Sequence, residues 1–86
     1  MKYIVLNLKG EDQIIVFPRI IDHDRMRDAM NAIKFGNDRN WERKYHDAKL
    51  VSAGFIDNGI CHGKSESLNI KSRPELDTHL FKVSIK

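Results

Sequence analysis

Small hydroxyl and cationic side chains are concentrated in residues 62–73, HGKSESLNIKSR. Such side chains bind negative charge, because each offers a hydrogen-bond donor or a positive charge to an anion. Arg73 is the first candidate for contact with a ligand or a partner, since it stands at the start of an expected helix, where the dipole favours anions. The residues that we predict to form an anion-binding site are His62, Lys64, Ser65, Ser67 and Arg73.

The run Gly63-Lys64-Ser65 also resembles the end of a phosphate-binding loop. However, three residues separate Gly59 from Gly63, whereas the Walker pattern has four. Polar extended chain follows the run, where a P-loop would continue into a long helix. We therefore expect an anion held by backbone amides near Gly63 together with Lys64 and Ser65, and not a P-loop.

A second cluster combines aromatic and cationic residues in 37–49, NDRNWERKYHDAK. If this segment is helical, Trp41 and Tyr45 lie one turn apart on one face, with Arg39 and Arg43 one turn apart beside them. These residue types stack on bases and dominate protein–protein hot spots. The structural alternative, which we favour, is that the two rings pack over the edge of the core while the charges are solvated.

Patterns for catalysis or metal binding are weak. The four histidines lack the spacing of paired ligands, and Cys61 and His62 point to opposite faces of a strand, where Cys61 is most simply a small core residue. Neither a Gly-flanked serine elbow nor a close pair of carboxylates in contrasting environments is indicated. We therefore predict no metal site, no cofactor and no enzymatic activity.

Length and composition limit the class of protein. With 86 residues, 41% of them hydrophobic, the chain is expected to form one globular domain over 1–86, with 37–49 as a surface insertion. No apolar run approaches the roughly 18 residues of a membrane span, and the lone Cys61 cannot form an internal disulfide, so we expect a cytoplasmic protein. The net charge of +3 permits an anionic partner without requiring one.

Hydrophobic patterning predicts the elements of the first half. Residues 2–8 are apolar on both faces, which suits a central strand, and 13–17 return antiparallel to it after the turn 9–12. A helix follows, with Asp22 as N-cap, Ile21 and Met26 as a hydrophobic staple, and Gly36 at its end. Its predicted core stripe is Met26, Ala29, Met30 and Ile33.

The second half opens with a strand at 50–56 that reverses at Asp57-Asn58-Gly59, a strong hairpin signal. Ser72-Arg73-Pro74-Glu75 predicts a capping box and a short helix through Leu80. The alternation of Phe81, Val83 and Ile85 predicts a last strand, either added to the sheet or lent to a neighbouring chain. The summed pattern predicts an α+β fold: a small, mostly antiparallel sheet of four to five strands with two or three helices on one face.

The chain also resembles a group of short accessory proteins encoded by tailed phages and prophages. The pieces that carry the resemblance are Met1-Lys2-Tyr3-Ile4-Val5, Val16-Phe17-Pro18, Asp22-His23, Ser52-Ala53-Gly54-Phe55, Gly59, Cys61, Gly63, Ser65, Ser67-Leu68 and Ser72-Arg73-Pro74-Glu75. They span most of the chain outside 37–49. The resemblance implies a phage origin more than a mechanism, and small phage proteins of this kind often act against host defence.

Together, these features lead us to expect a stoichiometric binding protein that counters host defence in the cytoplasm of the host cell. As a homo-oligomer, it would hold an anionic, nucleotide-like ligand between subunits. The alternative is a protein–protein inhibitor of a host defence complex, similar in role to anti-CRISPR proteins, with Trp41, Tyr45, Arg39 and Arg43 at the interface. Nucleic-acid binding through Arg39, Arg43, Lys44 and Lys49 is less favoured, and no membrane partner is expected.

Overall fold

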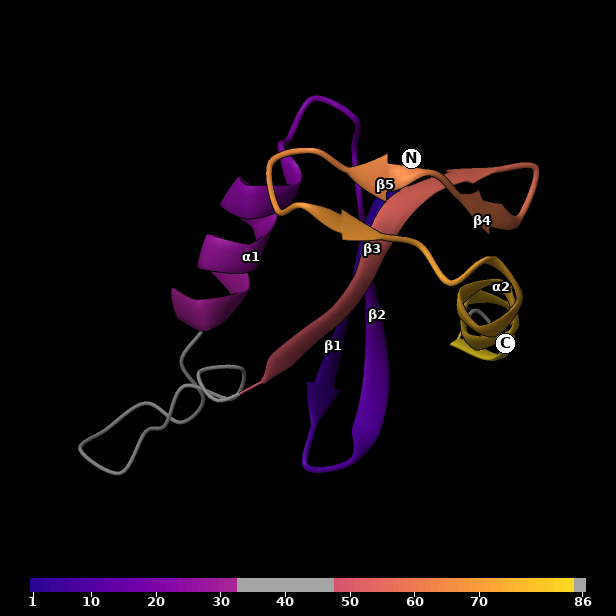
Figure 1. Cartoon of the computed structure of the whole chain (residues 1–86), viewed down its shortest axis with the longest axis horizontal. Helices are drawn as coiled ribbons and strands as arrows, with labels where there is room; N and C mark the ends of the chain where they lie inside the picture. The colour runs from indigo at the N-terminus through magenta and orange to yellow at the C-terminus, as the bar shows by residue number, and fades with distance from the viewer. Residues whose placement is uncertain (33–47, 85–86) are drawn as a thin grey trace.

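The computed structural model describes residues 1–32 and 48–84. These residues form a four-stranded antiparallel sheet, a separate two-stranded hairpin and two helices, which confirms the predicted α+β fold (Figure 1). The elements in chain order are β1 (Lys2–Leu8), β2 (Glu11–Phe17), α1 (His23–Ala32), β3 (Lys49–Asp57), β4 (Ile60–His62), β5 (Lys64–Ser65), β6 (Ile70–Lys71) and α2 (Pro74–Ser84). The sheet order β2-β1-β3-β4 makes β1 a central strand, as its apolar sequence predicted.

Two tight turns set the register of the sheet. Asn58 and Gly59 have φ of 53° and 78° and join β3 to β4, so the predicted reversal at Asn-Gly is confirmed. Lys9 and Gly10, with φ of 53° and 87°, join β1 to β2 in the same way. Positive φ at both positions matches the twist of a two-residue hairpin. Because two residues suffice, β2 begins at Glu11 and not at Gln13 as expected.

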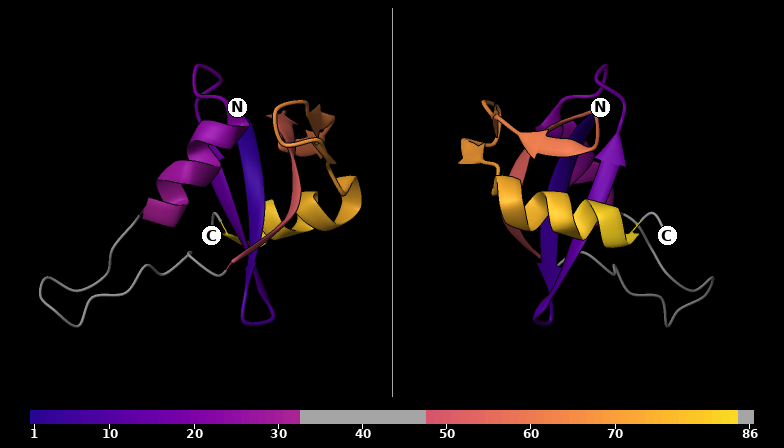
Figure 2. Two further views of the ribbon diagram at one scale, coloured as in Figure 1. Left: turned by 60° about the vertical axis from the view of Figure 1, so that its left-hand side comes forward. Right: turned by 90° about the vertical axis from the view of Figure 1, so that its right-hand side faces the viewer.

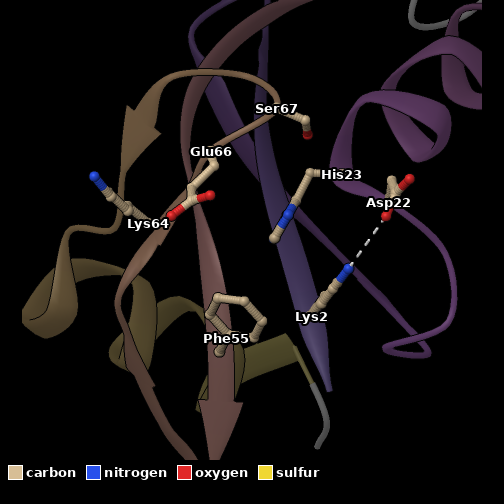
Figure 3. Close-up of a pocket in the computed structure, with 7 residues that line it drawn as sticks. All are labelled: Lys2, Asp22, His23, Phe55, Lys64, Glu66 and Ser67. Atoms are coloured by element: carbon tan, nitrogen blue, oxygen red, sulfur yellow. Dashed lines mark ion pairs between the residues drawn. The ribbon is translucent and has the colours of Figure 1, made fainter.

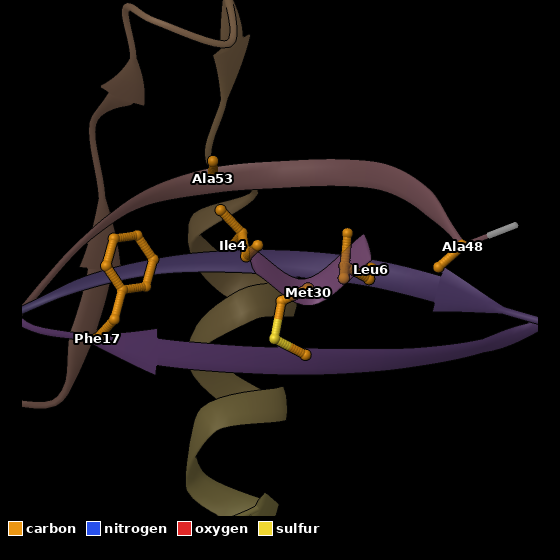
Figure 4. Packing of buried hydrophobic residues seen from close by; sticks show 6 residues of the cluster. All are labelled: Ile4, Leu6, Phe17, Met30, Ala48 and Ala53. Carbon is orange, nitrogen blue, oxygen red and sulfur yellow. The ribbon is translucent and has the colours of Figure 1, made fainter. Parts of the chain in front are cut away.

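The two helices cover opposite faces of the sheet, which corrects the expectation that all helices lie on one face (Figure 2). One core contains Ile4, Leu6 and Met30, the last from α1 (Figure 4). On the other face, Tyr3 and Val5 form a second core against which α2 packs. A central strand that is apolar on both sides must be covered on both sides.

Helix α1 departs in part from the predicted stripe. Ile21 and Met26 both pack against the first core, as the predicted staple requires, and Met30 is buried. Ala29, however, is exposed, and His23 takes the buried position one turn before Met26. The predicted Ile33 and Gly36 lie outside the described residues.

Helix α2 replaces the predicted short helix and last strand. It runs without interruption from Pro74 to Ser84, and Phe81 packs against the second core from within the helix, while Ile85 lies outside the described residues. The predicted strand depended on only three apolar residues at alternate positions, Phe81, Val83 and Ile85. A pattern this short does not distinguish a strand from one face of a helix. The capping interaction also differs from the predicted box. The N–H and Oγ of Ser72 both donate to Gly63 O, and the backbone N–H of Arg73 donates to Asp77. Neither described helix is long and apolar enough to cross a membrane.

Candidate functional site

A cleft of about 500 Å³ opens between the β5–β6 hairpin and the N-terminus of α1 (Figure 3). Its volume falls within the range of small-molecule sites, about 300–1,000 Å³. The lining residues come from four parts of the chain that are distant in sequence: Lys2, Asp22, His23, Phe55, Lys64, Glu66 and Ser67.

His23 forms a buried part of the lining, with 4% of its surface exposed. Its Nε2 lies 2.9 Å from the carbonyl oxygen of Gly54, and because a carbonyl only accepts, Nε2 must carry the proton. The rings of Phe17 and Phe55 meet the imidazole edge-on, each with a centroid distance of 5.5 Å. These contacts fix the first residue of α1 against β3.

Ser67 connects the hairpin to the helix. Its Oγ accepts the backbone N–H of Asp24 at 3.3 Å, so the hairpin supplies an N-terminal hydrogen bond to α1. Ser65, by contrast, is buried, and its Oγ accepts the N–H of Leu68 at 3.1 Å, which stabilises the turn between β5 and β6. Of the two predicted serines, only Ser67 lines the cleft.

Charges of both signs line the cleft. Lys2 Nζ donates to the carbonyl of Ile21 at 3.1 Å and lies 3.8 Å from Asp22 Oδ1. Lys64 and Glu66 are both exposed on the hairpin, and Lys64 lies directly across from Lys71 in the β5–β6 register. In Figure 3 the ammonium group of Lys64 points away from His23, while the Glu66 carboxylate lies nearer to the cleft. The cleft therefore offers hydrogen-bond acceptors and the ammonium group of Lys2, while the ammonium group of Lys64 is directed away from it.

Arg73 lies elsewhere, in a network of ion pairs. Its Nη2 is 3.1 Å from Asp12 Oδ2 and 2.9 Å from Asp77 Oδ1, and its Nε donates to Asp77 Oδ1 at 3.0 Å. Burial lowers the pKa of the guanidinium, but the hydrogen bonds that it donates to Asp12 and Asp77 outweigh burial and raise the pKa overall. Arg73 therefore has two carboxylate partners within its own chain.

His62 is also separate from the cleft. Its Nε2 lies 2.6 Å from Asp57 Oδ2, and its ring stacks on Phe55 with a centroid distance of 6.2 Å. Arg19 pairs with the same carboxylate at 3.0 Å. The hydrogen bond from His62, followed by the charge of Arg19, holds the pKa of Asp57 below its ordinary value.

The structure thus brings together two of the five residues predicted for the anion site, Lys64 and Ser67. Trp41, Tyr45, Arg39 and Arg43 lie outside the described residues. Sequence reasoning missed Lys2, Phe55 and Glu66 as lining residues. It identified Asp22 only as a helix cap. For Phe55, the one signal was its position in the predicted strand 50–56, which comes shortly before the hairpin in the chain.

Within residues 1–32 and 48–84, no group of three or more His, Cys, Asp or Glu side chains is placed to hold a metal ion. Comparison with known proteins finds no matching family model, no matching curated protein and no matching solved structure.

Proposed function

We propose that this chain is a phage-type accessory protein that counters host defence by binding a small nucleotide-like anion in the cleft. The observation that carries the proposal is that Lys64 and Ser67, both predicted from sequence to contact an anion, line one cleft together with Lys2. The phage origin rests on the resemblance of the sequence.

The mixed lining favours a ligand with more than one kind of polar group. Lys2 would attract a phosphate, and the positive end of the α1 dipole adds to that field. The ammonium group of Lys64 points away from His23 in Figure 3, so this exposed side chain would have to turn toward the cleft to contact a phosphate. Glu66 and Asp22 accept hydrogen bonds, which suits sugar hydroxyls and the amino groups of a base. The two carboxylates repel the phosphate of any ligand, but only a nucleotide also brings hydroxyl and amino donors that can bond to them.

Binding without turnover, by a homo-oligomer, completes the proposal. The lining residues all belong to one chain, so a neighbouring subunit would extend the cleft and not create it. Stoichiometric capture removes a scarce signalling nucleotide when the protein outnumbers the ligand and its concentration exceeds the Kd.

Isothermal titration calorimetry tests this function. The purified chain is titrated at low ionic strength with mononucleotides, cyclic dinucleotides and inorganic phosphate. We expect at least one nucleotide to bind with one site per chain and more tightly than phosphate, and Lys64→Ala to weaken that binding about tenfold, or about 1.4 kcal/mol. Lys82→Ala removes the same charge from the last turn of α2, away from the cleft, and should leave the affinity unchanged. Absence of nucleotide binding, or equal losses in both variants, would contradict the proposal.

A further inference from the structure

The two edges of the four-stranded sheet differ in how they are covered. At one edge, β4 has only three residues, and the backbone N–H of Cys61 donates to Thr78 Oγ1 of α2 at 2.9 Å. At the other edge, β2 has seven residues, and no strand among the described residues pairs with its outer side. An edge of that length is a template for pairing with another chain.

Alternate residues of β2 direct their backbone groups outward. Leu8 and Glu11 flank a two-residue turn and therefore form a hydrogen-bonded pair. Because such pairs alternate along an antiparallel ladder, the odd-numbered residues of β2 bond to β1. Asp12, Ile14 and Val16 consequently present three N–H and three C=O groups at the outer edge of the sheet.

Two of the usual devices that protect an edge strand, charged residues and a bulge, are missing from the middle of β2. Gln13 to Phe17 carry no charge, and the register with β1 is continuous, without a bulge. The side chain of Asp12 is turned toward Arg73, with which it forms an ion pair. Only Pro18, directly after the strand, limits how far a pairing could extend.

We infer that β2 pairs antiparallel with β2 of a second copy of this chain, joining two sheets into one. A two-fold axis at Ile14 pairs Asp12 with Val16 of the second copy and Ile14 with its own equivalent, so all six outward groups are satisfied. A shift of the axis to Ile15 would place Asp12 opposite Pro18, which has no N–H and whose carbonyl already accepts Ile21 N. A shift to Gln13 would place Val16 opposite Gly10, whose N–H already donates to Asn7 Oδ1. The Ile14-centred register is therefore selected.

The surroundings of β2 suit this arrangement. Ile14 and Val16 pack against the second core, as do Leu80 and Phe81 from the C-terminal half of α2. Val83, in that end of the helix, is 46% exposed, and a two-fold axis at β2 brings the two helix ends toward each other. The acidic residues at the start of β2 lie at opposite ends of the paired strands, so like charges do not face one another.

Amide hydrogen exchange of the native protein, with light scattering for its mass, tests the pairing. We expect a dimer in which the amides of Asp12, Ile14 and Val16 are protected, and exchange at least tenfold faster on dilution to the monomer. The alternate amides of Gln13 and Ile15 should be protected in both states, because they bond to β1. A monomer at all accessible concentrations, or a dimer in which the three outward amides exchange freely, would overturn the inference.

A matched pair of variants gives a second test. Ile14→Pro removes the outward N–H and blocks the partner strand, whereas Ile14→Ala trims the side chain but keeps the N–H. We expect the alanine variant to dimerise and the proline variant to be a folded monomer. If the proline variant does not fold, hydrogen exchange on the native chain still decides whether β2 pairs with a second copy. The pairing does not depend on the ligand proposed for the cleft, so a dimer that binds no nucleotide would contradict only the proposed function.

Discussion

The phenol of Tyr3 donates a 2.6 Å hydrogen bond to Asp77 Oδ2, which joins the central strand of the sheet to the last helix. Asp77 is completely buried, and it also accepts hydrogen bonds from Ser52 Oγ at 3.0 Å and from Arg73. A buried carboxylate is tolerated only when it is paired and hydrogen-bonded. This network therefore determines where α2 lies on the sheet.

Replacing Tyr3 with phenylalanine should lower the free energy of unfolding by about 1.5–3 kcal/mol, because Asp77 loses one donor in a site without water access. Urea denaturation followed by circular dichroism measures this change. Leu76→Ala, at a residue of the same helix that is 63% exposed, should cost less than about 0.5 kcal/mol. Similar losses for the two variants would show that the hydrogen bond contributes little.

Alkaline pH should destabilise the fold through the same residue. Burial, with the hydrogen bond to Asp77 and its charge, raises the pKa of Tyr3 well above its ordinary value near 10. The stabilisation is fully present below the unfolded-state pKa and is lost as the pH rises above about 10, because only the unfolded chain then releases the proton. Unfolding free energies measured between pH 8 and 11 should therefore decline, and decline less in Tyr3→Phe. Parallel pH profiles for the two proteins would contradict this prediction.

Acid pH should destabilise the fold through Asp12. The hydrogen bond from Asn7, opposed by partial burial and assisted by Arg73, lowers the pKa of its carboxyl group. That stabilisation is present above the unfolded-state pKa of about 3.9 and is lost as the pH falls through the lower folded-state pKa. Asp12→Asn should cost less than about 1 kcal/mol at pH 7, since the group is partly exposed, and the difference from the native protein should shrink below pH 4. A difference that stays constant from pH 6 to pH 2 would exclude this role.

Gly54 is required by the close approach of β4. A Cβ built at this residue would lie 2.4 Å from the carbonyl oxygen of His62, and backbone cannot move aside cheaply. Gly54→Ala should therefore cost more than about 2 kcal/mol, or prevent folding. Gly10→Ala is the comparison: no atom lies within 4 Å of its Cβ, and only its φ of +87° is unfavourable, at about 1 kcal/mol. Thermal unfolding of both variants shows which loses more stability. An equal loss, or a larger loss in Gly10→Ala, would contradict the steric explanation.

Most of the fold was predictable because it depends on local signals. The apolar pattern of residues 2–8 indicated a central strand, and Asn58-Gly59 indicated the hairpin turn. The errors came from long-range packing. A central strand apolar on both faces already implied cover on both sides, yet the helices were expected on one, and Phe81 was assigned to a strand because its contact with the second core is not visible in local sequence.

The candidate site was predictable only in part. Lys64 and Ser67 were identified by residue type, and their role in binding stays a prediction. Arg73 was favoured because it precedes a helix, but one of its carboxylate partners, Asp12, lies far earlier in the chain, and no local pattern shows that pairing. His23 lines the cleft because its imidazole contacts the carbonyl of Gly54 on β3. That contact also depends on long-range packing, which local sequence does not show.

Amide chemical shifts show directly whether the cleft binds a nucleotide. The ¹⁵N-labelled protein is titrated with the nucleotide that binds best in calorimetry. If the cleft is the site, the largest shifts should occur at Asp24, Lys64, Glu66 and Ser67, and saturate at one ligand per chain. The α2 amides next to Arg73 should shift least, because Arg73 is held by Asp12 and Asp77. Shifts centred on Arg73 and the start of α2, with the hairpin unaffected, would contradict the assignment of the cleft.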